Sequence, residues 1–188
     1  MFAPLGASEA EMNKKVLVAY ATKYGATAEI AETMCEVLSE AGLNAEVVSV
    51  DEVRDVVLYD AIVLGSAVYA GYWRKEAAKF LQTHEAMLVQ RPVWLFSSGP
   101  MGEGDPVELM EGWYFPKNLQ ASADRIEPEE ITVFHGKLDT DQLTLFDRWI
   151  IKMVKAPSGD FRDWAVIEAW ATAVADKLKE AHVVVESS

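Results

Sequence analysis

Cysteine is almost absent from this 188-residue chain, which contains only Cys35. A single cysteine excludes an intrachain disulfide. Histidine is also scarce. His84, His135 and His182 lie far apart and lack metal-ligand spacing, so we expect no metal site. The longest stretch without a charged residue, Ala61–Trp73, is shorter than the roughly 20 residues that a bilayer-spanning helix needs. Disulfide scaffolds, zinc proteins and integral membrane proteins are therefore disfavoured.

Basic residues are few, with 17 Lys and Arg against 30 Asp and Glu and a net charge of −13. This balance argues against a nucleic-acid partner, because binding to phosphate backbones depends on Lys and Arg. An acidic surface can guide a protein to basic redox partners, or it can simply keep the protein in solution. Both interpretations stay open at this point.

Apolar residues make up 51% of the chain and aromatic residues 10%, which is typical of a packed globular protein. We predict a flexible leader over residues 1–13, one domain over 14–182 and a tail over 183–188. The first residues do not form a basic region followed by an apolar core, so a cytoplasmic location is expected.

Segments with strand-like and helix-like patterns alternate along the chain. Strands are expected over residues 16–21, 45–50, 61–65, 92–97 and 131–135. Helices are expected over residues 27–40, 74–85 and 163–181, with a short helix capped by Asp105. This alternation predicts an α/β fold with a parallel sheet covered on both faces. A further helix over 139–155, within an insert spanning 139–160, exceeds what the alternation requires.

The first predicted strand leads into a helix through a short polar loop, residues 22–27. Backbone N–H groups and the helix dipole favour an anion at such a helix start, and Thr22 and Thr27 can add hydroxyl donors. The loop lacks both G-x-x-x-x-G-K-[ST] and G-x-G-x-x-G, which excludes the nucleoside-triphosphate and dinucleotide motifs. A phosphate site is one interpretation; an ordinary turn that binds nothing is the other.

Two more loops leave the carboxyl ends of strongly apolar strands: residues 66–73, rich in aromatics, and residues 97–104, rich in glycine and hydroxyls. Ligands of doubly wound sheets bind at this edge. The three loops together predict a flat slot for a planar aromatic ligand that carries a phosphate.

The Thr22–Thr27 loop resembles T-x-T-G-x-T, the phosphate loop of the flavodoxin-fold FMN-binding proteins, with Tyr24 in place of the middle threonine. The resemblance extends from Lys15 to about Ala181. It implies a three-layer, doubly wound, five-stranded parallel sheet in the order 2-1-3-4-5, and FMN as the cofactor. Redox chemistry would then take place on the flavin, and no side chain stands out as a catalytic acid or base.

The resemblance also implies the residues that would hold FMN. The residues at the phosphate would be Thr22, Lys23, Tyr24, Gly25, Ala26 and Thr27. One face of the flavin ring would be lined by Ala67, Val68, Tyr69 and Gly71. The other face would be lined by Ser97, Ser98, Gly99 and Gly102. The role of Tyr24 is open, and either Tyr69 or Trp73 would stack on the ring.

More narrowly, the loop Gly65–Tyr72 and the segment Phe146–Met153 are similar to those of the flavodoxin-like, menaquinone-dependent protoporphyrinogen oxidases. This implies a porphyrinogen substrate and a quinone acceptor. Basic residues beside an apolar stripe over 143–155 raise the prospect of a peripheral contact with the inner face of the membrane. The alternative is that this stripe packs against the protein itself.

Two other functions fit the sequence. One is a carrier that shuttles electrons between redox partner proteins, for which the acidic surface and the three loops are suitable. The other is a domain of the same fold that has lost its flavin and acts as an interaction module. The insert does not distinguish the carrier from the enzyme.

Overall fold

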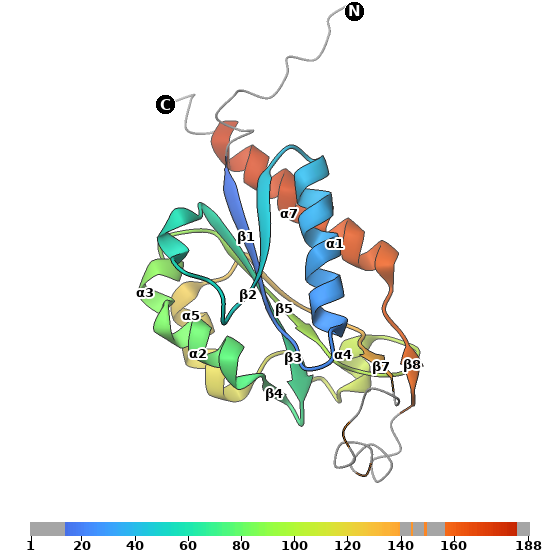
Figure 1. Ribbon diagram of the computed structural model, residues 1–188. Coiled ribbons are helices and arrows are strands. Elements are labelled where there is room, and N and C mark those ends of the chain that lie inside the picture. The colour runs from blue at the N-terminus through green and yellow to red at the C-terminus, as the bar shows by residue number, and fades with distance from the viewer. Residues whose placement is uncertain (1–13, 140–143, 145–148, 150–156, 184–188) are drawn as a thin grey trace, which may run out of the picture.

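The computed structural model describes residues 14–139, 144, 149 and 157–183. The described part contains a central sheet with five parallel strands in the order β2-β1-β3-β5-β6 (Figure 1). These strands are β1 (Lys15–Ala21), β2 (Asn44–Ser49), β3 (Ala61–Tyr69), β5 (Val93–Ser98) and β6 (Glu130–Phe134). Counted along the chain, this is the predicted order 2-1-3-4-5, which is confirmed.

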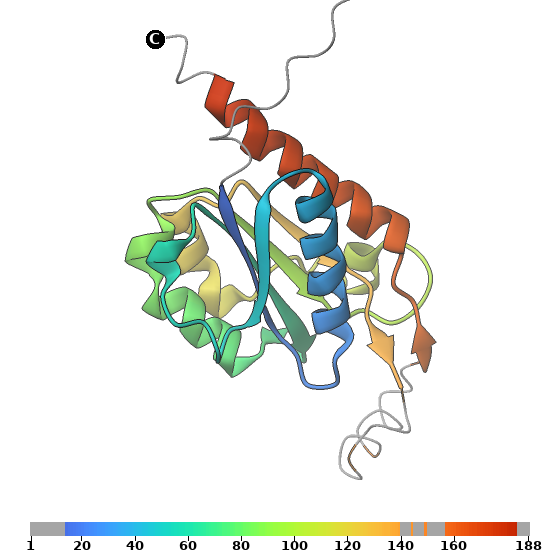
Figure 2. The ribbon, with the colours of Figure 1, turned by 45° about the horizontal axis from the view of Figure 1, so that its top comes forward.

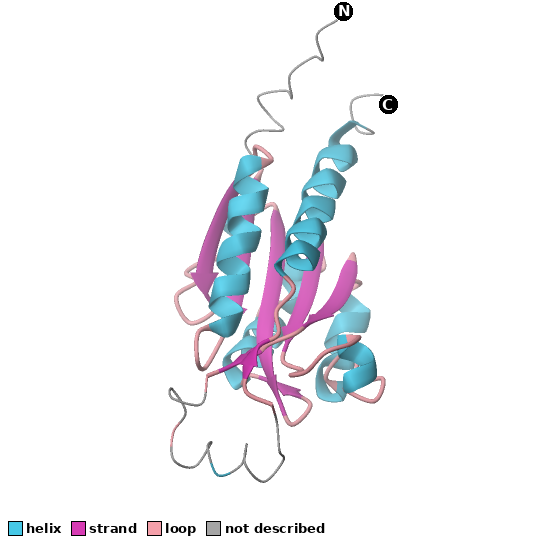
Figure 3. Cartoon of the chain, turned by 90° about the vertical axis from the view of Figure 1, so that its right-hand side faces the viewer, coloured by secondary structure: helices cyan, strands magenta, loops and turns pink. Residues whose placement is uncertain are grey.

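Helices cover both faces of the sheet, as Figures 1 and 3 show. On one face lie α1 (Ala26–Glu40) and α7 (Trp164–Val183). On the other lie α2 (Lys75–Thr83), α3 (Glu85–Leu88) and α5 (Gln120–Ile126). Short helices α4 (Pro106–Leu109), η2 (Val56–Leu58) and η3 (Lys117–Leu119) occupy connections. The predicted cap of α4 is confirmed, because the Asp105 carboxylate accepts hydrogen bonds from two backbone N–H groups.

Alternate residues of the strands supply two hydrophobic cores, one on each face of the sheet. Leu17 and Leu64 belong to the core under α2 and α5, whereas Val16 and Val63 belong to the core under α1 and α7. This division follows from the two-residue period of a strand. Because both faces are buried, these strands appear in the sequence as continuous apolar runs.

The apolar residues of α1 and α7 pack against one face of the sheet. Ile30, Met34 and Leu38 of α1 are buried against the sheet, and Cys35 beside them is half-buried. On α7, Trp170 is 9% exposed and makes edge contacts with the rings of Phe96 and Phe134. Trp170 is therefore a packing residue.

The segment expected to be a loop over 66–73 is largely a hairpin. β3 continues to Tyr69, and β4 (Tyr72–Trp73) returns antiparallel to it. Ala70 and Gly71, at the turn, have φ values of +50° and +79°, as in the tight turns that match strand twist. β3 continues because Ser66 and Ala67 pair with β5, a long-range contact that the local sequence does not announce.

A small ribbon lies next to the sheet, where β7 (Lys137–Leu138) pairs antiparallel with β8 (Gly159–Asp160). Figure 2 shows it beside the start of α1. The predicted leader over 1–13, the end of the predicted tail, and most of the predicted 139–155 helix with its membrane contact lie outside the described residues. No helix in the described part combines the length and apolar character needed to cross a bilayer.

Gly65 gives a test of the central packing. A Cβ atom at this position would lie 1.9 Å from the Phe96 ring, and Phe96 is fully buried. We expect Gly65→Ala to lower the free energy of unfolding, measured in urea, by about 1–3 kcal/mol or more through overpacking. The double variant with Phe96→Leu should recover part of the loss. Equal stability of Gly65→Ala and the wild type would contradict this account.

Candidate functional site

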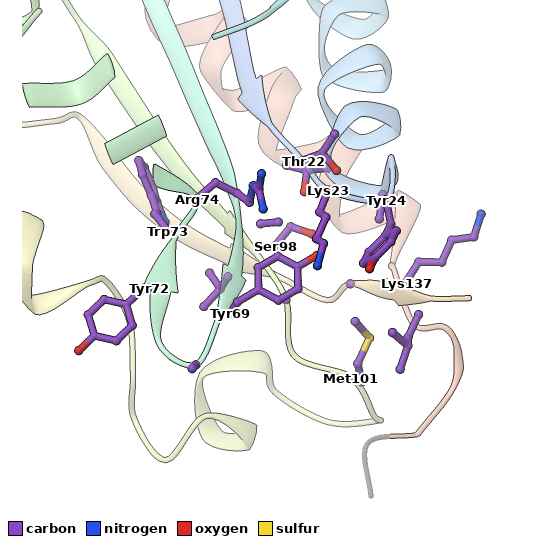
Figure 4. A pocket seen from close by; sticks show the side chains of 18 of the residues that line it. Thr22, Lys23, Tyr24, Tyr69, Tyr72, Trp73, Arg74, Ser98, Met101 and Lys137 are labelled. Atoms are coloured by element: carbon purple, nitrogen blue, oxygen red, sulfur yellow. The ribbon is translucent and has the colours of Figure 1, made fainter. Parts of the chain in front are cut away.

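A pocket of about 1230 Å³ opens at the carboxyl end of β1, β3 and β5. Its lining residues are drawn from within the segments 22–27, 67–78, 98–101 and 136–138, together with Asn118 and Pro157. Figure 4 shows side chains of these segments converging on the pocket. The pocket lies at the sheet edge where α/β proteins bind their ligands.

Most of the residues predicted from the sequence line this one pocket. They are Thr22, Lys23, Tyr24, Ala26, Thr27, Ala67, Val68, Tyr69, Ser98 and Gly99. Gly25, Gly71, Ser97 and Gly102 belong to the same loops but are not among the lining residues. The structure thus brings the three predicted loops together, and their binding of a ligand stays a prediction.

The loop before α1 has the form of an anion cradle. Gly25 adopts φ +88°, and its N–H donates to the Thr22 hydroxyl at 3.0 Å. The first N–H groups of a helix have no partner within it. Thr27, in this first turn, is 1% exposed, and its hydroxyl has no hydrogen-bond partner among the described residues. A buried hydroxyl in the wall of a pocket is suited to a ligand.

The β3–β4 hairpin forms the second wall. The Trp73 indole N–H donates to the Ser97 hydroxyl at 2.8 Å, and its ring meets Phe115 edge-on at 5.1 Å. Ser97 and Trp73 therefore fasten the hairpin to β5. Trp73 is only 5% exposed while Tyr69 is 45% exposed, so Tyr69 is the ring with more surface available for stacking.

The third wall, the loop after β5, is held by the end of β6. Gly99 N–H donates to the Phe134 carbonyl at 3.2 Å, and Gly136 N–H donates to the Pro100 carbonyl at 3.1 Å. A Cβ atom on Gly136 would lie 2.9 Å from Met101 Cε and 3.2 Å from the Gly99 carbonyl oxygen. The two segments approach closely at this glycine, so a larger residue would require Met101 and the loop to shift.

The pocket wall is cationic although the chain is acidic. Lys23, Arg74, Lys75 and Lys137 line it, against one lining carboxylate, Glu76. The Lys23 ammonium lies 5.1 Å from the centre of the Tyr24 ring, and Lys137 lies 3.5 Å from a Glu29 oxygen. The local charge favours an anionic ligand.

Arg162 ties the β7–β8 ribbon to the start of α1. Its side chain is 1% exposed and forms ion pairs with Asp160 at 2.6 Å and Glu29 at 2.8 Å. It also donates to the Ala26 carbonyl at 3.2 Å, and its guanidinium lies 4.4 Å from the Trp164 ring centre. Through hydrogen bonding, Arg162 holds the pKa of Asp160 below its usual value.

Sequence reasoning missed several lining residues, including Arg74, Met101, Asn118 and Lys137. The sequence position of Arg74 and Lys137 could have indicated that they line the pocket, because each follows a predicted strand or loop at the binding edge. Met101 lies within the predicted loop over 97–104, although it was not singled out there, and Asn118 carried no indication. No group of three or more His, Cys, Asp or Glu side chains in the described ranges is arranged to hold a metal ion.

Arg162→Met tests this tie. At neutral pH we expect the variant to lose about 1–3 kcal/mol of unfolding free energy, since charged hydrogen bonds are broken. Asp160 has a lowered pKa in the folded state, so its contribution is complete above the unfolded value of about 3.9 and is lost as the pH falls through the folded value. The difference between wild type and variant, from urea unfolding, should therefore shrink in acid.

Lys177→Met is the matched control, because Lys177 pairs with Glu129 at 3.6 Å on the exposed surface. That pair should contribute about 0–1 kcal/mol. An Arg162→Met deficit that keeps its full size as the pH is lowered until Asp160 is protonated would show that the ion pair with Asp160 does not cause it.

Comparison with known proteins agrees with the fold. Protoporphyrinogen IX dehydrogenase [quinone] from Escherichia coli strain K12 is 25% identical over 173 residues, covering 86% of this chain and 94% of that protein. A flavodoxin from the domain Archaea has a TM-score of 0.55 at 15% identity, covering 88% of this chain and 99% of its own. A short-chain flavodoxin associated with a non-canonical PDU bacterial microcompartment has a TM-score of 0.57 at 14% identity, with coverages of 90% and 97%.

A family profile described as a flavodoxin domain matches residues 17–164, most of the chain. This range includes the phosphate-type loop, the hairpin and the loop after β5. Membership implies a flavin cofactor, in agreement with the position and lining of the pocket. The chain belongs to the flavodoxin-domain family.

Proposed function

We propose that the protein binds FMN noncovalently and acts as a flavin-dependent oxidoreductase. The observation that carries this proposal is the buried Thr27 hydroxyl, which lacks a partner in the described part of the chain and lies in the first turn of α1 within the pocket wall. A phosphate accepts hydrogen bonds from hydroxyl and backbone N–H donors at such a helix start. The cationic residues of the pocket wall also favour a phosphate, because they attract a negatively charged ligand.

The residues present fit the cofactor. The loop over 22–27 would hold the phosphate, and the hairpin and the loop after β5 would flank the ring, with Tyr69 as the stacking side chain. When bound, FMN supplies the transfer of electrons, while the protein positions it and tunes its potential. The hydrogen bonds from β6 to the loop after β5 keep that wall in place.

For the reaction, we propose oxidation of a porphyrinogen with a quinone as acceptor. The support is the relation to the E. coli dehydrogenase, which extends over 94% of that protein. Two electrons and two protons would leave the substrate and reach the quinone in each turnover. A pocket of about 1230 Å³ exceeds the common range of small-ligand sites, about 300–1,000 Å³, and leaves room beside the flavin.

The second candidate is an electron carrier without a substrate of its own. The net charge of −13 favours it, because basic redox proteins would be attracted to the surface. The two functions differ in how electrons pass, since a carrier separates the two electrons and an oxidase need not.

Thr27→Val tests the cofactor site. Without flavin, the variant should be as stable as the wild type or about 1 kcal/mol more stable, because valine removes a buried hydroxyl that has no partner. Its dissociation constant for FMN, measured by calorimetry, should rise about tenfold through loss of one charged hydrogen bond.

Thr33→Val is the control for this comparison. Thr33 lies on the same helix, outside the pocket lining, and its hydroxyl donates to the Glu29 carbonyl at 3.1 Å. Unchanged FMN affinity in Thr27→Val would count against the site.

Stepwise anaerobic reduction of the FMN-loaded protein separates the two candidate functions. We expect the visible spectrum to pass directly from oxidised to fully reduced flavin, and porphyrin absorbance to appear when protoporphyrinogen and menaquinone are then supplied. Reduction in two resolved one-electron stages, with no porphyrin formed, would instead favour the carrier.

A further inference from the structure

Arg74 stands in the pocket wall, immediately before α2, at a position fixed by the main chain. Its backbone N–H donates to the Ser66 hydroxyl at 2.9 Å. In Figure 4 its guanidinium points toward the loop before α1, in the direction of Thr22 and Ser98, whereas Tyr72 points away. Because the anchoring contact belongs to the backbone, the side chain can be replaced without removing it.

The guanidinium of Arg74 has more donors than partners. Nη2 pairs with a Glu76 carboxylate oxygen at 3.1 Å, and the side chain is 27% exposed. Nε is buried and has no hydrogen-bond partner among the described residues. A guanidinium offers five N–H donors, and leaving a buried donor unpaired is unfavourable. The group is therefore well placed to take an acceptor from a ligand.

The neighbouring cations are engaged differently. Lys23 lies over the Tyr24 ring, and Lys137 pairs with Glu29. Apart from Lys23, the loop over 22–27 supplies hydroxyl and backbone donors, which are neutral. A phosphate monoester carries close to two negative charges at neutral pH, and a planar guanidinium matches its oxygens in a two-pronged contact. In a chain of net charge −13, such a cation offsets the repulsion that a phosphate would meet.

We propose that Arg74 binds the phosphate of the flavin nucleotide, and that this contact makes the pocket select FMN over riboflavin. The proposal rests on the proposed function, because it assumes that a flavin occupies the pocket. In this proposal Arg74 determines specificity by contacting the phosphate and not the flavin ring. The flavin ring is held by other residues, the hairpin and the loop after β5.

Calorimetric titration with FMN and, separately, with riboflavin tests the assignment. Arg74→Gln should weaken FMN binding about tenfold or more, the loss expected for a charged hydrogen bond, and should leave riboflavin binding within about twofold. Retained riboflavin binding also shows that the variant is folded. Arg74→Lys keeps the charge but loses the planar fork, so its FMN affinity should fall by an intermediate factor.

Lys177→Gln is the charge-matched control, because it removes one positive charge from an exposed ion pair on α7. It should leave the ratio of the FMN and riboflavin affinities unchanged. Added salt should reduce this ratio more in the wild type than in Arg74→Gln, since salt screens a charge–charge contact. A purely structural role for Arg74 would not give that difference.

Equal losses for FMN and riboflavin in the Arg74 variants would overturn the inference, because Arg74 would then support the ring or the fold. Unchanged FMN affinity would overturn it as well. If the proposed function were wrong, the result would differ, because the wild-type protein would then bind neither FMN nor riboflavin.

Discussion

The parallel alignment of β1, β3 and β5 is the constraint on which the site depends. Ala21 pairs with Ser66, and Ser66 pairs with Ser97, so the carboxyl ends of three strands meet in one row. Segments separated by tens of residues in the sequence thus open onto the same edge. Gly65 makes this register compatible with the core, because the Phe96 ring occupies the space that a side chain would need.

A second layer of contacts positions the loops on this row. Trp73 and Ser97 join the hairpin to β5, and the end of β6 binds the loop after β5 through Gly99 and Gly136. Arg162 then connects the β7–β8 ribbon to the first turn of α1. The walls are therefore supported by contacts between the loops and by residues outside them, such as Gly136 and Arg162, which gives a preorganised pocket. This support suits a cofactor that the protein must hold in one orientation.

Local patterns in the sequence predicted the principal helices and the three loop segments, whereas the sheet order followed from the resemblance to flavodoxin-fold proteins. The apolar run that includes Leu17 and Val18 predicts a buried strand. The loop Thr22–Thr27 could be identified because its residues are contiguous in the sequence. The hairpin, α5 and the ribbon were not predicted. α5 is short and has no long apolar stripe, and Gly159–Asp160 has no strand character of its own. The role of Ser97 as an anchor for Trp73 depends on a long-range contact.

The pocket gathers cations at one edge of the sheet in an otherwise acidic protein, which suits the anionic cofactor proposed above. A carrier and an enzyme of this family would share that edge, and they would differ in the substrate that reaches the flavin. The relation to the E. coli dehydrogenase supports the enzyme, and the acidic surface is compatible with either function.

Hydrogen exchange with and without FMN tests the central claim most directly. Amides in residues 22–27, 66–73 and 98–104 should exchange more slowly when FMN is added, because these segments would form the walls of an occupied site. Amides around Leu178 of α7 should change little, because the Leu178 carbonyl accepts from Lys14 just before β1, at the opposite end of the sheet. Protection that is absent from the three loops, or that occurs only elsewhere, would contradict the account.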